Sequence, residues 1–404
     1  MAIFHMVEKV RAAWLEKKVS LGVFIDLKKA FDTVDHEILA KKLEHYGVRG
    51  QTLKLIRSYL ADRTQYVSYG GFESDRGKVI CGVPQGSVLG PLFFLLYVND
   101  MVAACRELDL VLFADDTSIF AKARNASELF EKVNRGLVDL SKWFRCNKLT
   151  LNLKKTEYVY FGGQGTRIVP PGGLNIGGEN IRRVEGARFL GVWVDEGLKW
   201  SEHIDNIRSK VSQLVGILGR ATAVLGGQMI KNLYNGLVLP HLQYCLLVWG
   251  DFQEGRNAKA GEALLKCQKR IVGFIEGKRG KYHADPIFYS NSILKIGDLY
   301  KQQLRIYGWR FWNGLLPAAQ ASLLSRVSNV HNHNTRSAGS ELFVSTDDQR
   351  SIAYRAPKEW QSLPRGLKDI KTLGNFKNQS KKALFKRYND FYCSNKDCYV
   401  CGRK

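Results

Sequence analysis

Hydrophobic and polar positions follow two different periods in the first part of the chain. Val19 to Ile25 is an apolar run broken only by one serine and one glycine, which predicts a buried strand that ends at Asp26. The residues from Leu27 to Leu39 then take on a helical period, and Met6 to Lys17 has the spacing of one amphipathic helix. An acid at the end of a buried strand has a fixed position from which it can reach a metal ion.

A hairpin is predicted further along the chain. Leu108 to Phe113 and Thr117 to Phe120 are rich in Val, Leu, Ile and Phe, as expected for two half-buried strands. The turn between them contains Asp115 and Asp116. For an isolated Asp-Asp pair, a solvated turn is the ordinary interpretation. Together with Asp26, however, these acids favour a shared metal site, because clustered carboxylates can hold two Mg²⁺ ions about 4 Å apart for phosphoryl transfer.

Two further acids and one glycine-rich segment lie between these elements. Asp32 and Asp35 follow the first strand, and we interpret them as facing solvent or capping the helix rather than as metal ligands. Gly82 to Pro91 contains three glycines and two prolines and precedes an apolar stretch. Gly86 would let this irregular backbone approach a flat ligand closely, as a floor beneath a nucleotide and its template base requires.

The pattern becomes helical in the second half. Leu174 to Trp193 indicates short strands that complete a first domain, and from Trp200 the apolar positions recur at helical spacing. Met229 to Trp249 and Glu262 to Ile275 predict further helices. An all-α unit is therefore expected after the strands.

The composition changes again near residue 330. Asn329 to Gly339 is rich in Asn, His, Arg, Ser and Gly, which indicates a linker, and Phe376 to Tyr388 predicts a basic helix beyond it. We therefore predict three domains, at residues 1–200, 201–330 and 331–404.

The order of these motifs resembles that of a known family. The segment from Val23 to Asp32, then Gly82 to Gly86, then Phe113 to Asp116, is similar to motifs A, B and C of reverse transcriptases, specifically those of Jockey-like non-LTR retrotransposons. Leu151 to Thr156 resembles motif D and Phe189 to Val192 resembles the motif E hairpin. The resemblance implies an α+β fold, in which a palm with an antiparallel sheet and packed helices is followed by an all-α thumb-like domain and a basic C-terminal segment.

The resemblance also implies roles for the acids. It assigns Asp26, Asp115 and Asp116 to two catalytic Mg²⁺ ions, with Mn²⁺ as a substitute, and makes Asp115 the more strictly required acid of its pair. Lys155 matches the basic residue near the leaving pyrophosphate, where a cation stabilises developing negative charge. A solvated lysine in a turn is the ordinary alternative.

Three other matches concern the incoming nucleotide. Phe31 matches the steric gate whose ring fills the space of a ribose 2′-hydroxyl, and core packing is the alternative for an apolar residue at this position. Gln85 and Gly86 match residues that line the nascent base pair. The implied reaction is RNA-directed synthesis of DNA from dNTPs on an RNA template and a DNA primer.

The chain departs from the family pattern at its front. Only 25 residues precede Asp26, so we expect the fingers strands and the endonuclease of such elements to be absent from this N-terminally truncated chain. Binding of the triphosphate would then depend on metal and palm contacts alone.

Charge is distributed unevenly along the chain. The net charge is +23, and residues 201–404 carry 32 Lys and Arg against 15 Asp and Glu. A basic second half is expected to grip nucleic-acid phosphates, since their neutralisation supplies most non-specific affinity. A merely basic soluble protein is the alternative.

The cysteines and the apolar segments indicate the compartment. Five scattered cysteines suit buried free thiols of an intracellular chain, whether nuclear or cytoplasmic. Cys393, Cys398 and Cys401 form a C-x₄-C-x₂-C cluster that lacks a fourth ligand, so zinc is not expected there. No apolar stretch approaches 20 residues and no secretory signal is recognisable, so neither a membrane partner nor secretion is expected.

Two hypotheses follow from the sequence. The first is an RNA-directed DNA polymerase that uses two-metal nucleotidyl transfer. The second is a catalytically impaired remnant of a retroelement that only binds nucleic acid.

Overall fold

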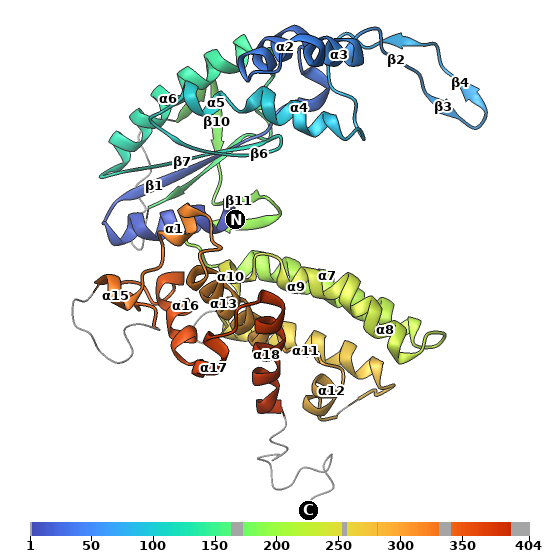
Figure 1. The fold of residues 1–404 in the computed structure, drawn as a ribbon, viewed down its shortest axis with the longest axis vertical. Coiled ribbons are helices and arrows are strands. Elements are labelled where there is room, and N and C mark those ends of the chain that lie inside the picture. The colour runs from blue at the N-terminus through green and yellow to red at the C-terminus, as the bar shows by residue number, and fades with distance from the viewer. Residues whose placement is uncertain (1, 163–172, 253–256, 281, 331–340, 389–404) are drawn as a thin grey trace, which may run out of the picture. The chain divides into compact units, whose positions relative to one another are not determined.

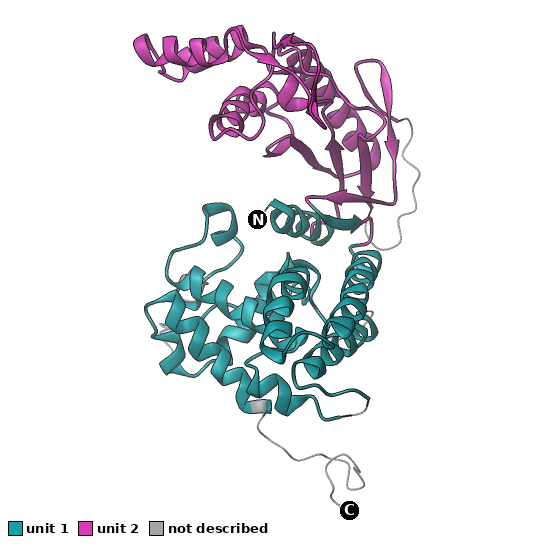
Figure 2. Cartoon of the chain, turned by 90° about the vertical axis from the view of Figure 1, so that its right-hand side faces the viewer, with its two compact units in different colours: residues 1–15, 191–194, 198–404 teal, residues 16–190, 195–197 magenta. Residues whose placement is uncertain are grey.

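The computed structural model describes residues 2–162, 173–252, 257–280, 282–330 and 341–388. The chain divides into two compact units (Figure 2). The sheet unit consists of residues 16–190 and 195–197, and the helical unit consists of residues 1–15, 191–194 and 198–404. The N-terminal helix α1 (Ala2–Leu15) therefore belongs to the unit that holds the C-terminal helices.

A six-stranded sheet with the order β6-β7-β1-β8-β10-β9 organises the sheet unit (Figure 1). All neighbouring strands pair antiparallel except β8 and β10, which are parallel. The strands are β1 (Val19–Ile25), β6 (Asp109–Phe113), β7 (Asp116–Ala123), β8 (Glu157–Phe161), β9 (Leu174–Ile176) and β10 (Glu179–Arg183). The predicted strand and hairpin are confirmed.

Helices cover the core side of this sheet. Leu21, Val23 and Ile25 alternate along β1 and are at most 3% exposed, so they join the main core of the unit. The longest covering helix, α6 (Ala126–Cys146), has an apolar stripe at helical spacing and is capped by Asn125, which accepts from the Glu128 N–H. The other helices are α2 (His36–His45), α3 (Gly50–Leu60), α4 (Leu89–Val98) and α5 (Met101–Ala104).

The remaining strands of this region are short. Two exposed ribbons are formed by β2 (Thr64–Gln65) with β5 (Gly77–Lys78), and by β3 (Ser68–Tyr69) with β4 (Phe72–Glu73). Near residue 190, β11 (Gly186–Phe189) and β12 (Val192–Asp195) pair as a hairpin, as the motif E resemblance implies.

The continuous helical period predicted from Leu27 to Leu39 is wrong. Leu27 forms a bridge with Leu151, and a 3₁₀ helix, η1 (Ala30–Thr33), follows Lys29, whose φ is 48°. The α-helix α2 begins only at His36. The carbonyl groups of this stretch accept hydrogen bonds from residues 82 and 83 instead of continuing a helical ladder.

The described part of the helical unit is built almost entirely from helices. They are α1, α7 (Ser201–Ala221), α8 (Gly227–Leu233), the π-helix η2 (Tyr234–Val238), α9 (Leu239–Gln243), α10 (Leu246–Trp249), α11 (Ala258–Ile275), α12 (Asp285–Ser290), α13 (Ile296–Trp312), α14 (Ala318–Ala321), α15 (Val327–Val330), α16 (Ile352–Gln361), α17 (Arg365–Lys368), α18 (Leu373–Phe385) and η3 (Lys386–Tyr388). The single helix predicted from Met229 to Trp249 is broken, because the π-helix interrupts it and Cys245 has a φ of 52°.

The C-terminal helices pack on α13. Arg305 pairs with Glu359 of α16 at 2.7 Å, and the Trp309 ring stacks on Phe376 of α18 at 5.7 Å. Residues 341–388 thus share a unit with residues 201–330. The three-domain division stays a prediction, and most of the predicted linker lies outside the described residues.

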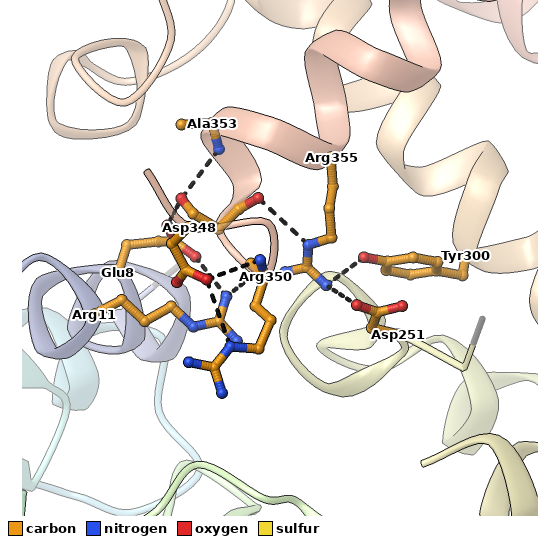
Figure 3. A network of polar contacts seen from close by, with 9 residues as sticks. Glu8, Arg11, Asp251, Tyr300, Asp348, Arg350, Ala353 and Arg355 are labelled. Atoms are coloured by element: carbon orange, nitrogen blue, oxygen red, sulfur yellow. Dashed lines mark hydrogen bonds and ion pairs between the residues drawn. The ribbon is translucent and has the colours of Figure 1, made fainter. Parts of the chain in front are cut away.

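A buried polar network joins α1 to the start of α16 (Figure 3). Glu8 pairs with Arg11 at 3.2 Å and accepts a 2.6 Å hydrogen bond from the Ser351 hydroxyl. Arg11 also donates to the backbone carbonyl of Arg350. Burial and the nearby charge of Arg355 lower the pKa of Arg11. The contacts of its guanidinium group with Glu8 and with the Arg350 carbonyl therefore offset the cost of burying a positive charge.

No described helix combines the length and the apolar character that crossing a lipid bilayer demands.

Candidate active site

Strand register brings the three predicted acids to one end of the sheet. Ile25 pairs with Thr117 in the antiparallel ladder of β1 and β7, so Asp26 and Asp116, the next residue along each strand from this pair, both lie at this end of the ladder. Asp115 lies in the two-residue turn between Phe113 and Asp116, which pair with each other. The tight turn thus fixes the backbone of the acidic pair beside the end of β1.

The charges at this end of the sheet repel one another. Partial burial of the Asp116 carboxyl, together with the negative charges of Asp115 and Asp26, raises its pKa. In the described part of the chain, no hydrogen bond or ion pair reaches the side chain of Asp115 or Asp116. This end of the sheet therefore carries negative charge that a cation would neutralise.

The acids do not form a ready-made metal cage. Among the described residues, no group of three His, Cys, Asp or Glu side chains is gathered closely enough to hold an ion. The backbone positions are set by the sheet, whereas the exposed carboxylates of Asp115 and Asp116 can rotate about their side-chain bonds. Oxygen donors with excess negative charge are what Mg²⁺ prefers, so the residues fit a divalent ion once these side chains turn toward it.

Asp26 is held by the segment that follows α6. Asn152 donates from Nδ2 to Asp26 Oδ2 at 2.7 Å and from its backbone N–H to the Asp26 carbonyl at 2.8 Å. The Asp26 N–H donates to Thr156 Oγ1 at 3.3 Å. The motif D resemblance includes Asn152 and Thr156 but implies a role for neither. The signal that the sequence offers for their role is the presence of two polar side chains in the segment that resembles motif D.

Lys155 lies in the exposed turn before β8, where its N–H donates to the Asn152 carbonyl at 3.0 Å. No contact in the described residues links its ammonium group to the acids. The assignment of Lys155 to the leaving group therefore stays a prediction.

Phe31 lies in η1 and is half-buried. Its ring packs on that of Phe94, with centroids 4.6 Å apart, and it lies against the core of the sheet unit. The position of Phe31 is thus compatible both with core packing and with the predicted role as a steric gate.

The glycine-rich segment before α4 is shaped as expected. Gln85 and Gly86 are exposed, and Gly86 has a φ of 80° with nothing within 4 Å of the position of an added Cβ. The space over this glycine is open to a ligand. Gln85 donates from Nε2 to Asp32 Oδ1 at 2.8 Å. Asp32 thus faces solvent and binds Gln85, whereas Asp35 caps α2 by accepting from the Ile38 N–H.

The five cysteines outside the terminal cluster are free thiols. Cys393, Cys398 and Cys401 lie outside the described residues, so the expectation about zinc stays a prediction.

Comparison with known proteins identifies the region that carries the acids. Residues 2–194 match the family described as reverse transcriptase (RNA-dependent DNA polymerase). The RNA-directed DNA polymerase from mobile element jockey of Drosophila melanogaster is 29% identical over 268 residues, covering 64% of this chain and 29% of the relative. A probable RNA-directed DNA polymerase from transposon X-element of the same species is also 29% identical, covering 61% of this chain and 28% of the relative.

A solved structure of telomerase from Candida albicans aligns with 74% of this chain and 54% of its own, at a TM-score of 0.36 and 14% identity. This chain spans less than a third of the length of the two Drosophila relatives. Residues 2–194 nevertheless carry the motifs in order and match the reverse transcriptase family model, and the chain is similar to the polymerases of these two mobile elements.

Proposed function

We propose that this chain is the polymerase part of a non-LTR retrotransposon protein, an RNA-directed DNA polymerase that extends a DNA primer on an RNA template. The observation that carries the proposal is the strand register that brings Asp26 to the same end of the sheet as Asp116, beside the Asp115 turn. Acids from two segments about ninety residues apart thereby share one end of the sheet, where partial burial and the charges of Asp115 and Asp26 raise the pKa of Asp116.

In the proposed reaction the primer 3′-oxygen attacks the α-phosphate of a dNTP and pyrophosphate leaves. Asp26, Asp115 and Asp116 would hold two divalent ions, Mg²⁺ or Mn²⁺, which when bound stabilise charge on the attacking and leaving oxygens. The open backbone at Gly86 would receive the nascent base pair, with Gln85 beside it. Phe31 would exclude a ribose 2′-hydroxyl, and Lys155 would stabilise the negative charge of the departing pyrophosphate.

The helical unit is proposed to act as the thumb and to contact the duplex of template and primer. It includes residues 201–404, where basic residues outnumber acidic ones by 32 to 15. Binding of this kind weakens steeply with salt because each phosphate contact releases counterions.

Primer extension by the purified chain tests the proposal. With a primed RNA template, dNTPs and Mg²⁺, we expect the chain to extend the primer. Asp115→Asn should lower the rate of extension at least about a hundredfold, because the carboxylate that balances the metal charge is replaced by a neutral amide. Asp139→Asn is the matched control, because this exposed acid pairs with Lys142 on the surface of α6.

The result that would favour the alternative is equally specific. Retention of duplex on a filter at low salt, without extension in Mg²⁺ or Mn²⁺, would identify a remnant that binds nucleic acid and does not polymerise.

A further inference from the structure

Two segments of the candidate site, residues 31–36 and 81–85, are joined by hydrogen bonds at several points. The Gly82 N–H donates to the Val34 carbonyl at 2.7 Å and the Val83 N–H donates to the Phe31 carbonyl at 2.9 Å. His36 Nε2 lies 2.7 Å from the Gly82 carbonyl oxygen. The backbone that carries Phe31 and the backbone that leads to Gln85 are therefore one continuous hydrogen-bonded structure.

The closest approach is between Gly82 and Asp32. A Cβ at position 82 would lie 2.8 Å from the Asp32 carbonyl oxygen, and the φ of Gly82 is 91°. Only glycine fits this contact without a shift of the backbone. Cys81 adds a hydrogen bond from Sγ to the same carbonyl at 3.3 Å. Asp32 is thus held by its backbone, while its side chain reaches toward Gln85.

The side-chain bond between these residues sets the orientation of an exposed amide. Gln85 Nε2 lies 2.8 Å from Asp32 Oδ1. An ionised carboxylate can only accept hydrogen bonds, so the glutamine must present its NH₂ group to Asp32. Its carbonyl oxygen is then the group left to accept a hydrogen bond from a ligand. Among the described residues, Gln85 is the hydrogen-bond partner of the Asp32 carboxylate.

We propose that Asp32 is a positioning residue for nucleotide binding, which holds the Gln85 amide so that Oε1 accepts a hydrogen bond from a donor group of the incoming dNTP. The inference rests on the proposed function, because it takes the site beside Gly86 as the nucleotide site. Without Asp32 the exposed glutamine would sample many rotamers and both amide orientations, and the nucleotide would have to order it on binding.

Steady-state primer extension, which gives KM and kcat for dNTP, separates a positioning role of Asp32 from a structural one. We expect Asp32→Ala to raise the KM for dNTP about five- to tenfold while kcat changes less than about twofold, because the nucleotide must then order the Gln85 side chain on binding. Asp32→Asn should restore most of the affinity, since its Oδ1 still accepts from Gln85 Nε2. Glu37→Ala is the control, because among the described residues this exposed acid pairs with Arg57 alone, and the KM of this variant should equal that of the wild type.

A double-mutant cycle provides the second readout. Since Asp32 acts through Gln85, the double variant Asp32→Ala/Gln85→Ala should have the KM of Gln85→Ala alone. Multiplicative effects of the two substitutions, or an unchanged KM in Asp32→Ala, would overturn the inference. If Asp32→Ala does not fold, the Asp32→Asn and Gln85→Ala variants still decide, because Asp32→Asn must keep the wild-type KM and Gln85→Ala must raise it.

The wild-type chain separates the inference from the proposed function. A wild-type chain that fails to extend primers overturns the proposed function and this inference together. An active wild type whose Asp32 and Gln85 variants keep the wild-type KM overturns this inference alone.

Discussion

Asp26 is the most constrained of the three acids, because Asn152 and Thr156 bond its side chain and both of its backbone polar groups. Asn152 occupies Oδ2 and leaves Oδ1 as the oxygen that can turn to an ion. A partner of this kind orients a ligand before the metal arrives, and loss of such partners typically weakens metal binding about 10- to 100-fold.

We therefore expect Asn152→Ala to shift the Mg²⁺ concentration for half-maximal extension upward by about tenfold. A titration of Mg²⁺ in the primer-extension assay measures the shift, and Mn²⁺-dependent thermal stabilisation provides a readout without turnover. Lys154→Ala is the control in the same exposed turn. An Asn152→Ala variant with the wild-type metal dependence would show that the hydrogen bond has no part in metal binding.

Phe31 is expected to serve both selectivity and stability. Phe31→Ala should admit ribonucleotides, because the ring no longer fills the space of the 2′-hydroxyl. It should also lower the free energy of unfolding by about 1–3 kcal/mol, because the half-buried ring packs on Phe94. Competition between dNTP and rNTP incorporation measures the first effect and urea denaturation the second. Phe31→Tyr keeps a ring and should keep the discrimination, and equal discrimination by the alanine variant would contradict the gate.

At the scale of elements, α2 begins where the chain leaves the hydrogen-bonded junction with residues 81–83. Its N-cap Asp35 accepts from the Ile38 N–H at 3.0 Å and pairs with Lys148 at 2.6 Å. The hydrogen bond to Lys148, and then that to Ile38, lower the pKa of Asp35. The carboxylate form is thus the one that the folded state prefers.

Replacing Asp35 should destabilise the sheet unit in a pH-dependent way. We expect Asp35→Ala to cost about 1–2 kcal/mol at pH 7 and Asp35→Asn to cost less, because Asn still caps the helix but cannot pair with Lys148. Because the pKa is lowered on folding, this stability is present above the usual Asp pKa of about 3.9 and is lost as the pH falls through the lowered value. Urea denaturation from pH 7 to about pH 3 should show the wild type and Asp35→Asn converging. A gap that stays constant with pH would contradict the ion pair.

At the scale of the whole molecule, the first helix and the last helices belong to one unit, and the Glu8–Arg11 pair lies between them. Both side chains are nearly inaccessible, at 5% and 6% exposure. The desolvation that lowers the pKa of Arg11 makes an unpaired guanidinium costly there.

Glu8→Ala should therefore lower the free energy of unfolding of the helical unit by about 3–5 kcal/mol. Tryptophan fluorescence during urea denaturation reports this unit, because of the eight tryptophans only Trp143 lies in residues 16–190 or 195–197. Glu16→Ala is the control, since that exposed acid pairs with Lys18 and Lys122 at the surface. If Glu8→Ala is as stable as the control, α1 is not anchored by this pair.

The sequence by itself determined β1, the acidic hairpin, helices α7 and α11 and the order of the reverse transcriptase motifs. These features depend on side-chain periodicity and turn residues within one short segment, which can be read locally. The tertiary structure alone decided the register that brings Asp26 to the same end of the sheet as Asp116, the break in the helix predicted from Leu27 to Leu39, the bond between Asp32 and Gln85 and the placement of α1 among the C-terminal helices. Each of these depends on hydrogen bonds or packing between residues about 50 to 340 positions apart, and no local pattern of hydrophobic and polar residues specifies which distant groups will meet.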